Sequence, residues 1–317
     1  MSFAFVFAGQ GSQSVGMLAA LAAAEPTVRA TFDEASSVLG YDLWQLVSAG
    51  PDEALNATER TQPAMLAAGV AVWRVWRARG GALPAVVSGH SLGEFTALVC
   101  ADALDYPTAI ELVRFRGQVM QEAVPAGSGA MAAILGLDDE AVIAACLEAT
   151  EGGVVEAVNF NCPGQVVIAG DAQAALRAIH LAKTRGAKRA VTLPVSVPSH
   201  SSLMRGAGEK LRAKLATLTV RTPSIPYVSA VDARAHLEPA DVAEVLVRQI
   251  SSPVRWTDTL RALLGRGVAQ VIECGPGKVL TTLNRRIERG ADVSFLTTED
   301  PASIDTALSA TGAASHA

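Results

Sequence analysis

The residues Gly89-His90-Ser91-Leu92-Gly93 place a serine midway between two glycines, in the pattern G-x-S-x-G. An apolar run, Ala85 to Val87, precedes them, and an Ala/Leu/Val-rich stretch, Phe95 to Ala103, follows. This order predicts a strand, a sharp turn and a helix, in which the glycines let the backbone expose the serine hydroxyl. The free N–H groups at the helix start would stabilise an oxyanion there. Ser91 is therefore the candidate nucleophile; the alternative is a chance turn with a capping serine.

A serine hydroxyl is a weak nucleophile and needs a base within hydrogen-bond distance. His90 directly precedes Ser91 on the predicted strand, so its ring should point toward the other face. His200 lies between a Pro-Ser turn and a predicted helix start, at a junction between two predicted units, and such junctions border clefts. These positions favour His200 as the base. No aspartate can be assigned to orient its ring, and a backbone carbonyl could do so instead.

Arg116 is a third residue that could take part in chemistry. The stretch Tyr106 to Val124 has the periodicity of a helix, and Arg116 falls in the middle of its apolar stripe. A buried guanidinium is costly unless it meets an anion. The pattern is consistent with a receptor for a carboxylate-bearing substrate and, equally, with an ion pair to a carboxylate of the protein.

The composition limits the classes of function. The chain has 317 residues, half of them hydrophobic, and a net charge of -5, so it can bury a large core and has no basic field for nucleic acid or an anionic membrane surface. The four cysteines lack metal-ligand spacing, and we expect reduced core thiols and no metal. The start of the chain has no signal-peptide pattern, and no later stretch has the length and hydropathy of a membrane span. The composition therefore predicts a cytoplasmic protein.

Strands and helices alternate along most of the chain, which predicts an α/β fold with a mostly parallel sheet covered on both faces by helices. A Pro/Gly/Ser break at Pro125 to Gly129 opens a different pattern, in the order β-α-β-β-α-β. That order predicts an inserted ferredoxin-like subdomain. We expect a discontinuous catalytic domain (1–125 and 198–309), the ferredoxin-like subdomain (126–197) and a disordered tail (310–317).

The loop Gly9-Gln10-Gly11-Ser12-Gln13 follows the first predicted strand, Phe3 to Phe7. A glycine-rich loop in this place is typical of dinucleotide binding. However, Ser14 stands where the third glycine belongs, and no acidic residue ends a second strand. The loop is better explained as a support that holds Gln10 beside an active site.

Taken together, these motifs resemble the malonyl-CoA:acyl-carrier-protein transacylases of type II fatty acid synthesis. That family combines an α/β hydrolase-like domain with a ferredoxin-like insert, as expected here. The shared motifs span nearly the whole chain in the family's order: Gly9 to Gln13, Gln62 to Ala64, Gly89 to Glu94, Arg116-Gly117, Asn159 to Gln165, Pro198 to His200, and Glu273 to Gly277.

The resemblance implies a Ser91–His200 dyad, with the histidine ring held by the backbone carbonyl of Gln249. Arg116 would pair with the malonyl carboxylate. The implied reaction moves malonyl from malonyl-CoA to the phosphopantetheine thiol of acyl carrier protein through a Ser91 ester, without a metal or bound cofactor, and supplies malonyl-carrier protein for fatty acid synthesis. The resemblance also implies an oxyanion hole made by the backbone N–H groups of Gln10 and Leu92. It further implies that the side chain of Gln62 lines the site.

Two other functions are compatible with the same motifs. A hydrolase with this turn would release the acid to water, although Arg116 favours a carboxylate-bearing acyl group over a general ester. A binding relative could keep the fold without the chemistry, although the presence of Ser91, His200, Gln10 and Arg116 together argues against it.

Acyl carrier protein is typically acidic in this family, so a basic patch is expected near the cleft. Lys183, Arg185, Lys188 and Arg189 cluster at the end of the insert. We predict that Lys188 and Arg189 help to dock the carrier; the alternative is a solvated helix end.

Overall fold

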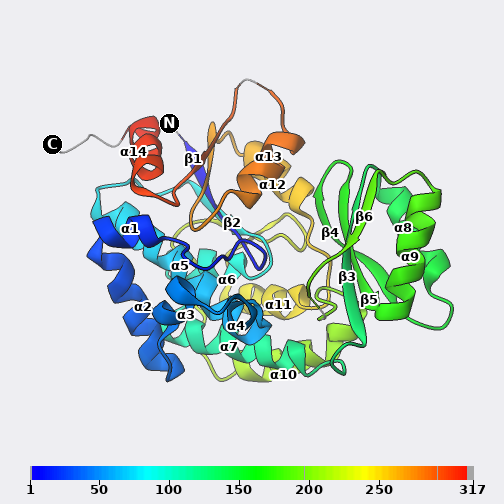
Figure 1. The fold of residues 1–317 in the computed structure, drawn as a ribbon. Helices are drawn as coiled ribbons and strands as arrows, with labels where there is room; N and C mark the ends of the chain where they lie inside the picture. The colour runs from blue at the N-terminus through cyan, green and yellow to red at the C-terminus, as the bar shows by residue number, and fades with distance from the viewer. Residues whose placement is uncertain (1, 196, 291, 313–317) are drawn as a thin grey trace.

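The computed structural model describes residues 2–195, 197–290 and 292–312 of the chain. Figure 1 shows a larger unit of strands and helices and, beside it, a smaller unit in green that contains strands β3 to β6. The two units have separate sheets, one mostly parallel and one antiparallel. The α/β class predicted from the sequence is confirmed.

The larger sheet has the strand order β10-β9-β1-β2-β7-β8. Every neighbouring pair is parallel except β7 and β8 at one edge. All five residues of β1 are buried, as expected for a strand covered on both faces. The strands are β1 (Phe3–Phe7), β2 (Val86–Gly89), β7 (Tyr227–Val228), β8 (Ala235–His236), β9 (Gln270–Glu273) and β10 (Ser294–Thr297).

Helices surround this sheet, and α5 shows how the sequence directs their packing. Trp76 of α5 makes edge-on ring contacts with Phe3 and Phe5 of β1, so alternate residues of the strand face this helix. The helices before the smaller unit are α1 (Ala19–Ala24), α2 (Pro26–Leu39), α3 (Leu43–Ala49), α4 (Asp52–Asn56), α5 (Thr58–Ala78), α6 (Gly93–Cys100) and α7 (Tyr106–Gln121). Those after it are the 3₁₀ turn Ser202–Met204, α10 (Arg205–Leu215), α11 (Pro239–Gln249), α12 (Trp256–Leu264), α13 (Val279–Ile287) and α14 (Pro301–Thr311).

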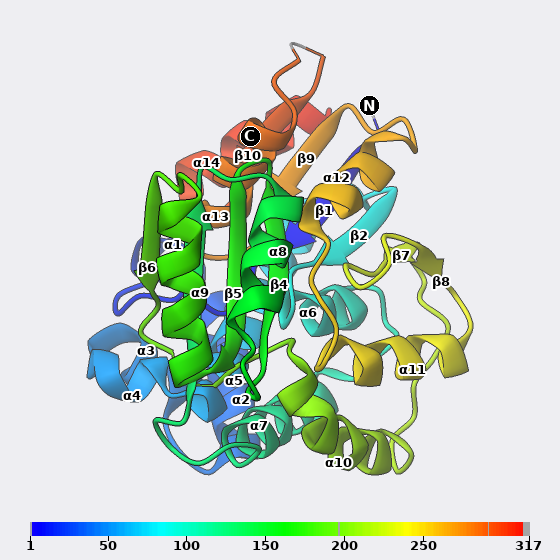
Figure 2. The same ribbon diagram turned by 90° about the vertical axis from the view of Figure 1, so that its right-hand side faces the viewer.

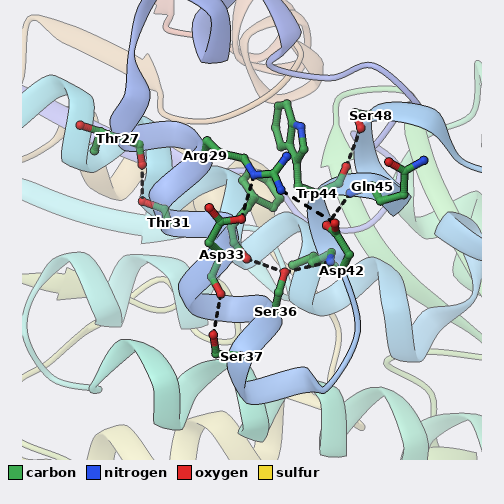
Figure 3. A network of polar contacts seen from close by, with 12 residues as sticks. Thr27, Arg29, Thr31, Asp33, Ser36, Ser37, Asp42, Trp44, Gln45 and Ser48 are labelled. Atoms are coloured by element: carbon green, nitrogen blue, oxygen red, sulfur yellow. Dashed lines mark hydrogen bonds and ion pairs between the residues drawn. The ribbon is translucent and has the colours of Figure 1, made fainter.

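The corner between α2 and α3 is fixed by the polar contacts shown in Figure 3. Asp42 accepts a hydrogen bond from the Gln45 N–H and so caps α3. Arg29 of α2 contacts Asp33 and reaches Asp42, and Ser36 accepts the Leu43 N–H. The bonds from Leu43 and Gln45 satisfy two N–H groups at the start of α3, and the Arg29 contact with Asp42 ties that start to α2.

The smaller unit has the predicted order of strands and helices. Its sheet has the order β4-β5-β3-β6, and every neighbouring pair is antiparallel. Figures 1 and 2 place α8 and α9 on the face turned away from the larger unit. The elements are β3 (Gly129–Leu135), α8 (Asp139–Ala149), β4 (Val155–Cys162), β5 (Gln165–Asp171), α9 (Ala172–Thr184) and β6 (Arg189–Thr192). This is the ferredoxin-like arrangement.

Strand β4 also joins the smaller unit to the larger one. The Val254 N–H donates to the Val158 carbonyl at 2.8 Å, and the Phe160 N–H donates to the Val254 carbonyl at 2.9 Å. Asn159 thereby forms a parallel bridge with Val254. The backbone bonds fix the two units against each other beside the site described below.

The structure differs from the sequence prediction at several boundaries. The stretch Gln62 to Arg79 has the pattern of a helix in the sequence, but helix α5 begins earlier, at Thr58, and passes through Pro63. Helix α14 runs to Thr311 and ends at Gly312 in the left-handed conformation, so the first part of the predicted tail is helical. The rest of that tail, 313–317, lies outside the described residues. Among the described helices, none has the length and hydropathy that crossing a membrane requires.

Candidate active site

The turn that carries Ser91 is built as the glycine spacing predicts. Strand β2 ends at Gly89, α6 begins at Gly93, and Ser91 between them has a φ of 53°. A Cβ on Gly89 would lie 2.0 Å from the Gly93 backbone, and one on Gly93 would lie 1.9 Å from the Phe7 carbonyl oxygen. Only glycine fits at either position, and the strained backbone holds the serine hydroxyl out of the sheet.

His200 meets Ser91 as predicted, although the two are far apart in the sequence. The Ser91 Oγ lies 2.8 Å from His200 Nε2, and His200 Nδ1 lies 2.8 Å from the Gln249 carbonyl oxygen. Because a carbonyl can only accept, Nδ1 carries the proton and Nε2 is free to accept the serine proton. The backbone carbonyl therefore does the work that an aspartate does in a triad.

The imidazole of His200 is held neutral. Its side chain is 3% exposed, and its pKa is lowered to about 3, first by burial and then by the nearby charge of Arg116. The hydrogen bond to the Gln249 carbonyl acts in the opposite direction. A neutral imidazole is the form that a general base requires.

Arg116 lies beside the serine, in the position where the helical periodicity places it. Its Nη1 donates to Gln62 Oε1 at 2.7 Å, and its Nη2 donates to Gln249 Oε1 at 3.0 Å and lies 3.4 Å from Ser91 Oγ. Burial lowers its pKa to about 10, and Glu94 opposes that shift. Within the described part of the chain, no carboxylate forms an ion pair with it. Two neutral amides therefore hold the guanidinium while its charge remains available to an anion.

These side chains surround a cavity of about 430 Å³ between the two units. The larger unit contributes polar groups, and the smaller unit contributes Met131, Asn159 and the segment Leu193 to Val195. A cavity of this size with a few convergent polar groups suits a small acyl group and part of its carrier arm. The predicted site residues that line it are Gln10, Gln62, Ser91, Leu92, Arg116 and His200.

The expected oxyanion hole has its two backbone groups at this cavity. Leu92 follows Ser91 at the start of α6, and Gln10 lies in the loop after β1. Gly9 brings that loop against the turn, since a Cβ there would lie 2.5 Å from the His90 carbonyl oxygen. Across the described ranges, neither the Gln10 nor the Leu92 N–H has a hydrogen-bond acceptor. Both groups are free to bind an oxyanion.

His90 makes a different contact from His200. Its Nε2 lies 2.9 Å from Asn161 Oδ1, and its ring lies 5.7 Å from that of Trp256. Burial lowers its pKa, and the Asn161 bond acts in the opposite direction. As predicted, its ring nitrogens do not bond to Ser91.

The sequence prediction missed the side chain of Gln249. Its Nε2 donates to the Ser91 carbonyl at 2.9 Å while its Oε1 accepts from Arg116. It also missed Glu94, which is fully buried behind this amide. The sequence shows an acidic residue directly after G-x-S-x-G. However, a carboxylate in the first turn of a helix is usually exposed, so the sequence does not indicate that Glu94 is buried.

Lys188 and Arg189 lie away from the serine cavity. With Arg286 of α13 they line a separate cavity of about 500 Å³ at the edge of the smaller unit. Arg185, from the same sequence cluster, pairs with Glu148 instead. The sequence cluster is thus divided, with Lys188 and Arg189 beside Arg286 and Arg185 held by Glu148.

The comparisons with known proteins agree with this geometry. Residues 4–297 match the family model described as an acyl transferase domain. The malonyl CoA-acyl carrier protein transacylase of Escherichia coli K12 is 53% identical over 306 residues, which cover 96% of this chain and 98% of that protein. The protein of the same name from Bacillus subtilis is 44% identical, with 96% of each chain covered.

Solved structures give the same result. An acyl carrier protein S-malonyltransferase from Vibrio cholerae superposes with a TM-score of 0.93 at 55% identity, covering 97% of this chain and 100% of that chain. A malonyl-transacylase in complex with a type II PKS acyl-carrier protein superposes with a TM-score of 0.96 at 52% identity, covering 98% and 100%. The chain therefore belongs to the acyl transferase domain family and, within it, to the malonyl CoA-acyl carrier protein transacylases.

Proposed function

We propose that this protein transfers the malonyl group of malonyl-CoA to the phosphopantetheine thiol of acyl carrier protein through an ester on Ser91. The observation that carries the proposal is one juxtaposition: Arg116 Nη2 lies 3.4 Å from Ser91 Oγ, and His200 Nε2 lies 2.8 Å from the same atom. A nucleophile with its base beside a buried cation suits an acyl group that ends in a carboxylate. The relatives carry the matching name.

In the first half-reaction, Ser91 Oγ attacks the thioester carbonyl while His200 Nε2 takes its proton. The carbonyl oxygen becomes an oxyanion, and the N–H groups of Gln10 and Leu92 donate to it. The C–S bond then breaks, and the CoA thiolate leaves with the proton from His200. Arg116 holds the malonyl carboxylate throughout.

In the second half-reaction, the thiol of acyl carrier protein replaces CoA. His200 takes the thiol proton, and the sulfur attacks the ester carbonyl on Ser91. The same two N–H groups stabilise the second oxyanion. The C–O bond breaks, Ser91 regains its proton from His200, and malonyl-carrier protein leaves. The proposed cycle uses no metal and no bound cofactor, and the product would feed fatty acid synthesis.

Mass spectrometry of the intact protein tests this function most directly. After mixing with malonyl-CoA, the protein should gain one malonyl group, and added acyl carrier protein should remove it. Acetyl-CoA should label the protein far less, and methylmalonyl-CoA probes how large an acyl group fits.

Ser91→Ala should abolish the labelling because no other hydroxyl lies beside His200 Nε2 among the described residues. Release of malonate to water without a thiol acceptor, at the rate of transfer, would indicate a hydrolase.

We further propose that Lys188 and Arg189 help to dock the acidic carrier. Both lie beside Arg286 at one cavity, and neither forms an ion pair with a described carboxylate. Reversing both charges (K188E/R189E) should raise the KM for acyl carrier protein, more strongly at low salt, because exposed charges are screened by salt. Loading from malonyl-CoA should not change.

The matched control for this test is K183E/R185E, which changes the net charge equally in the neighbouring helix end. It should have a smaller effect on the KM for the carrier. An unchanged KM in K188E/R189E at low salt would exclude this surface.

We also propose that the protein works in the cytoplasm. The support is its four cysteines, which are all buried and unpaired, as is usual in a reducing compartment.

A further inference from the structure

Glu94 is a buried carboxyl group that the proposed mechanism does not use. It lies in the first turn of α6, and none of its side chain is exposed. Tyr227 of β7 donates a hydrogen bond to its Oε2, and the side chains of Gln249 and Ser229 and the Ala230 N–H also face the group. Its Oε1 forms no bond of regular hydrogen-bond geometry among the described residues. An ionised carboxylate here is therefore poorly compensated.

Glu94 lies close enough to Arg116 to act on its charge. The two side chains do not form an ion pair, because Gln249 stands between them: its amide faces Glu94 and accepts from Arg116 Nη2 at 3.0 Å. Glu94 nevertheless raises the pKa of Arg116 against the effect of burial. In the empty site, an ionised Glu94 is thus the counter-charge of the guanidinium, acting across one amide.

We propose that Glu94 sets the preference for a carboxylated acyl group by carrying a proton whenever the acyl carboxylate lies on Arg116. The inference rests on the proposed function. An arriving acyl carboxylate adds a second negative charge beside one guanidinium, and neighbouring carboxylates disfavour each other's ionisation. The acyl carboxylate has the direct contact with Arg116, so Glu94 takes the proton from the solvent and returns it when the acyl group leaves. The net buried charge is zero in both states. In the empty site Arg116 carries +1 and Glu94 carries −1; with the acyl group bound, Arg116 carries +1, the acyl carboxylate carries −1 and Glu94 is neutral.

The other groups around Glu94 permit this exchange. Tyr227 stays neutral because burial and Glu94 hold its pKa well above 10. Two further titratable groups lie near Tyr227. The charge of Asp232 also raises the pKa of Tyr227, and the ring centre of His236 is 6.4 Å from that of Tyr227. Burial raises the pKa of Glu94 and so favours the protonated form, while the Tyr227 bond opposes this. Glu94 is therefore a positioning residue that acts on the substrate through Gln249 and Arg116.

The consequence is a pH dependence that distinguishes two substrates. As the pH rises through the pKa of Glu94, protonating it during malonyl binding becomes less favourable. The ratio of kcat/KM for malonyl-CoA to that for acetyl-CoA should then fall by up to about tenfold per pH unit. Acetyl brings no charge to Arg116, so its own loading should lack this dependence.

The test is the rate of Ser91 acylation from malonyl-CoA and from acetyl-CoA, measured from mildly acidic to neutral pH, below the range in which Arg116 itself loses its proton. In the wild type the ratio should fall with pH. In Glu94→Gln it should stay flat, because glutamine keeps an acceptor for Tyr227 and cannot ionise. The matched control is Glu273→Gln: Glu273 is also fully buried, but it accepts the N–H groups of Leu280 and Thr281 at the start of α13. That variant should keep the wild-type ratio at every pH.

Tyr227→Phe provides a second variant that does not depend on Glu94→Gln folding. Loss of the phenol removes a donor to the ionised carboxylate, so the pKa of Glu94 should rise and the fall in the ratio should move to higher pH. A ratio that is flat in the wild type, or that falls identically in Glu94→Gln, overturns the inference. If the wild type instead shows no preference for malonyl even at the lowest pH, the proposed function has failed.

Discussion

Replacing His200 with alanine is expected to slow acylation of Ser91 by about 10²- to 10⁴-fold, the usual contribution of a positioned general base. The structure gives the reason: His200 Nε2 lies 2.8 Å from Ser91 Oγ, and the Gln249 carbonyl fixes the ring in the tautomer that accepts. The measurement is the burst of acyl-enzyme from malonyl-CoA. His180→Ala is the matched control, since His180 is an exposed residue of α9.

The pH profile of the wild type should carry the signature of this histidine. Only the neutral imidazole accepts the serine proton, and the pKa of His200 is lowered to about 3. The kcat/KM for acylation by acetyl-CoA should therefore fall with acid only near that value, and not near 6.5, where an unperturbed histidine titrates. A full-rate His200→Ala variant, or an acid limb near 6.5, would show that another group is the base.

Replacing Arg116 with alanine should change the choice of substrate. Truncating one partner of a buried charge pair costs about 2 to 5 kcal/mol, so kcat/KM for malonyl-CoA should fall at least about tenfold. Acetyl-CoA has no carboxylate to lose, and its transfer should stay level or rise. Arg116→Lys should rescue malonyl transfer only in part, because an ammonium cannot reproduce the guanidinium fork. The measurement is the ratio of the two kcat/KM values.

The same variant gives a second readout. The charge of Arg116 lowers the pKa of His200, so its removal should move the acid limb of acetyl transfer upward. Equal loss of malonyl and acetyl transfer, or a protein that fails to fold, would instead assign Arg116 a structural role. The carboxylate receptor would then lie elsewhere.

The parts of the site that local pattern determines could be predicted from the sequence. The spacing of Gly89, Ser91 and Gly93 predicts the turn because no Cβ fits at either glycine, and helical periodicity places Arg116 on the inward face of α7. His200 could be predicted as the base only by its position at a domain junction. The role of the Gln249 carbonyl in orienting the His200 ring could be predicted only from the family resemblance.

Other features depend on contacts between distant segments, which the sequence does not reveal. The Gln249 side chain binds Ser91 and Arg116 because α11 ends beside both, and no local pattern marks that residue. Helix α5 begins before Pro63, and its first turn packs so closely against α7 that a Cβ on Gly117 would lie 2.7 Å from the Glu59 Cα. In each case tertiary structure determined the result.

The backbone bridge between Asn159 and Val254 has a consequence for the behaviour of the protein at high concentration. Strand β4 is the outermost strand on one side of the smaller sheet, and an exposed edge of its length is a template on which another chain can add a strand. The pairing of Val158 and Phe160 with Val254 occupies part of that edge from within the same molecule. The contact that joins the two units beside the cavity thus also leaves less of the β4 edge free to pair with a strand of another molecule.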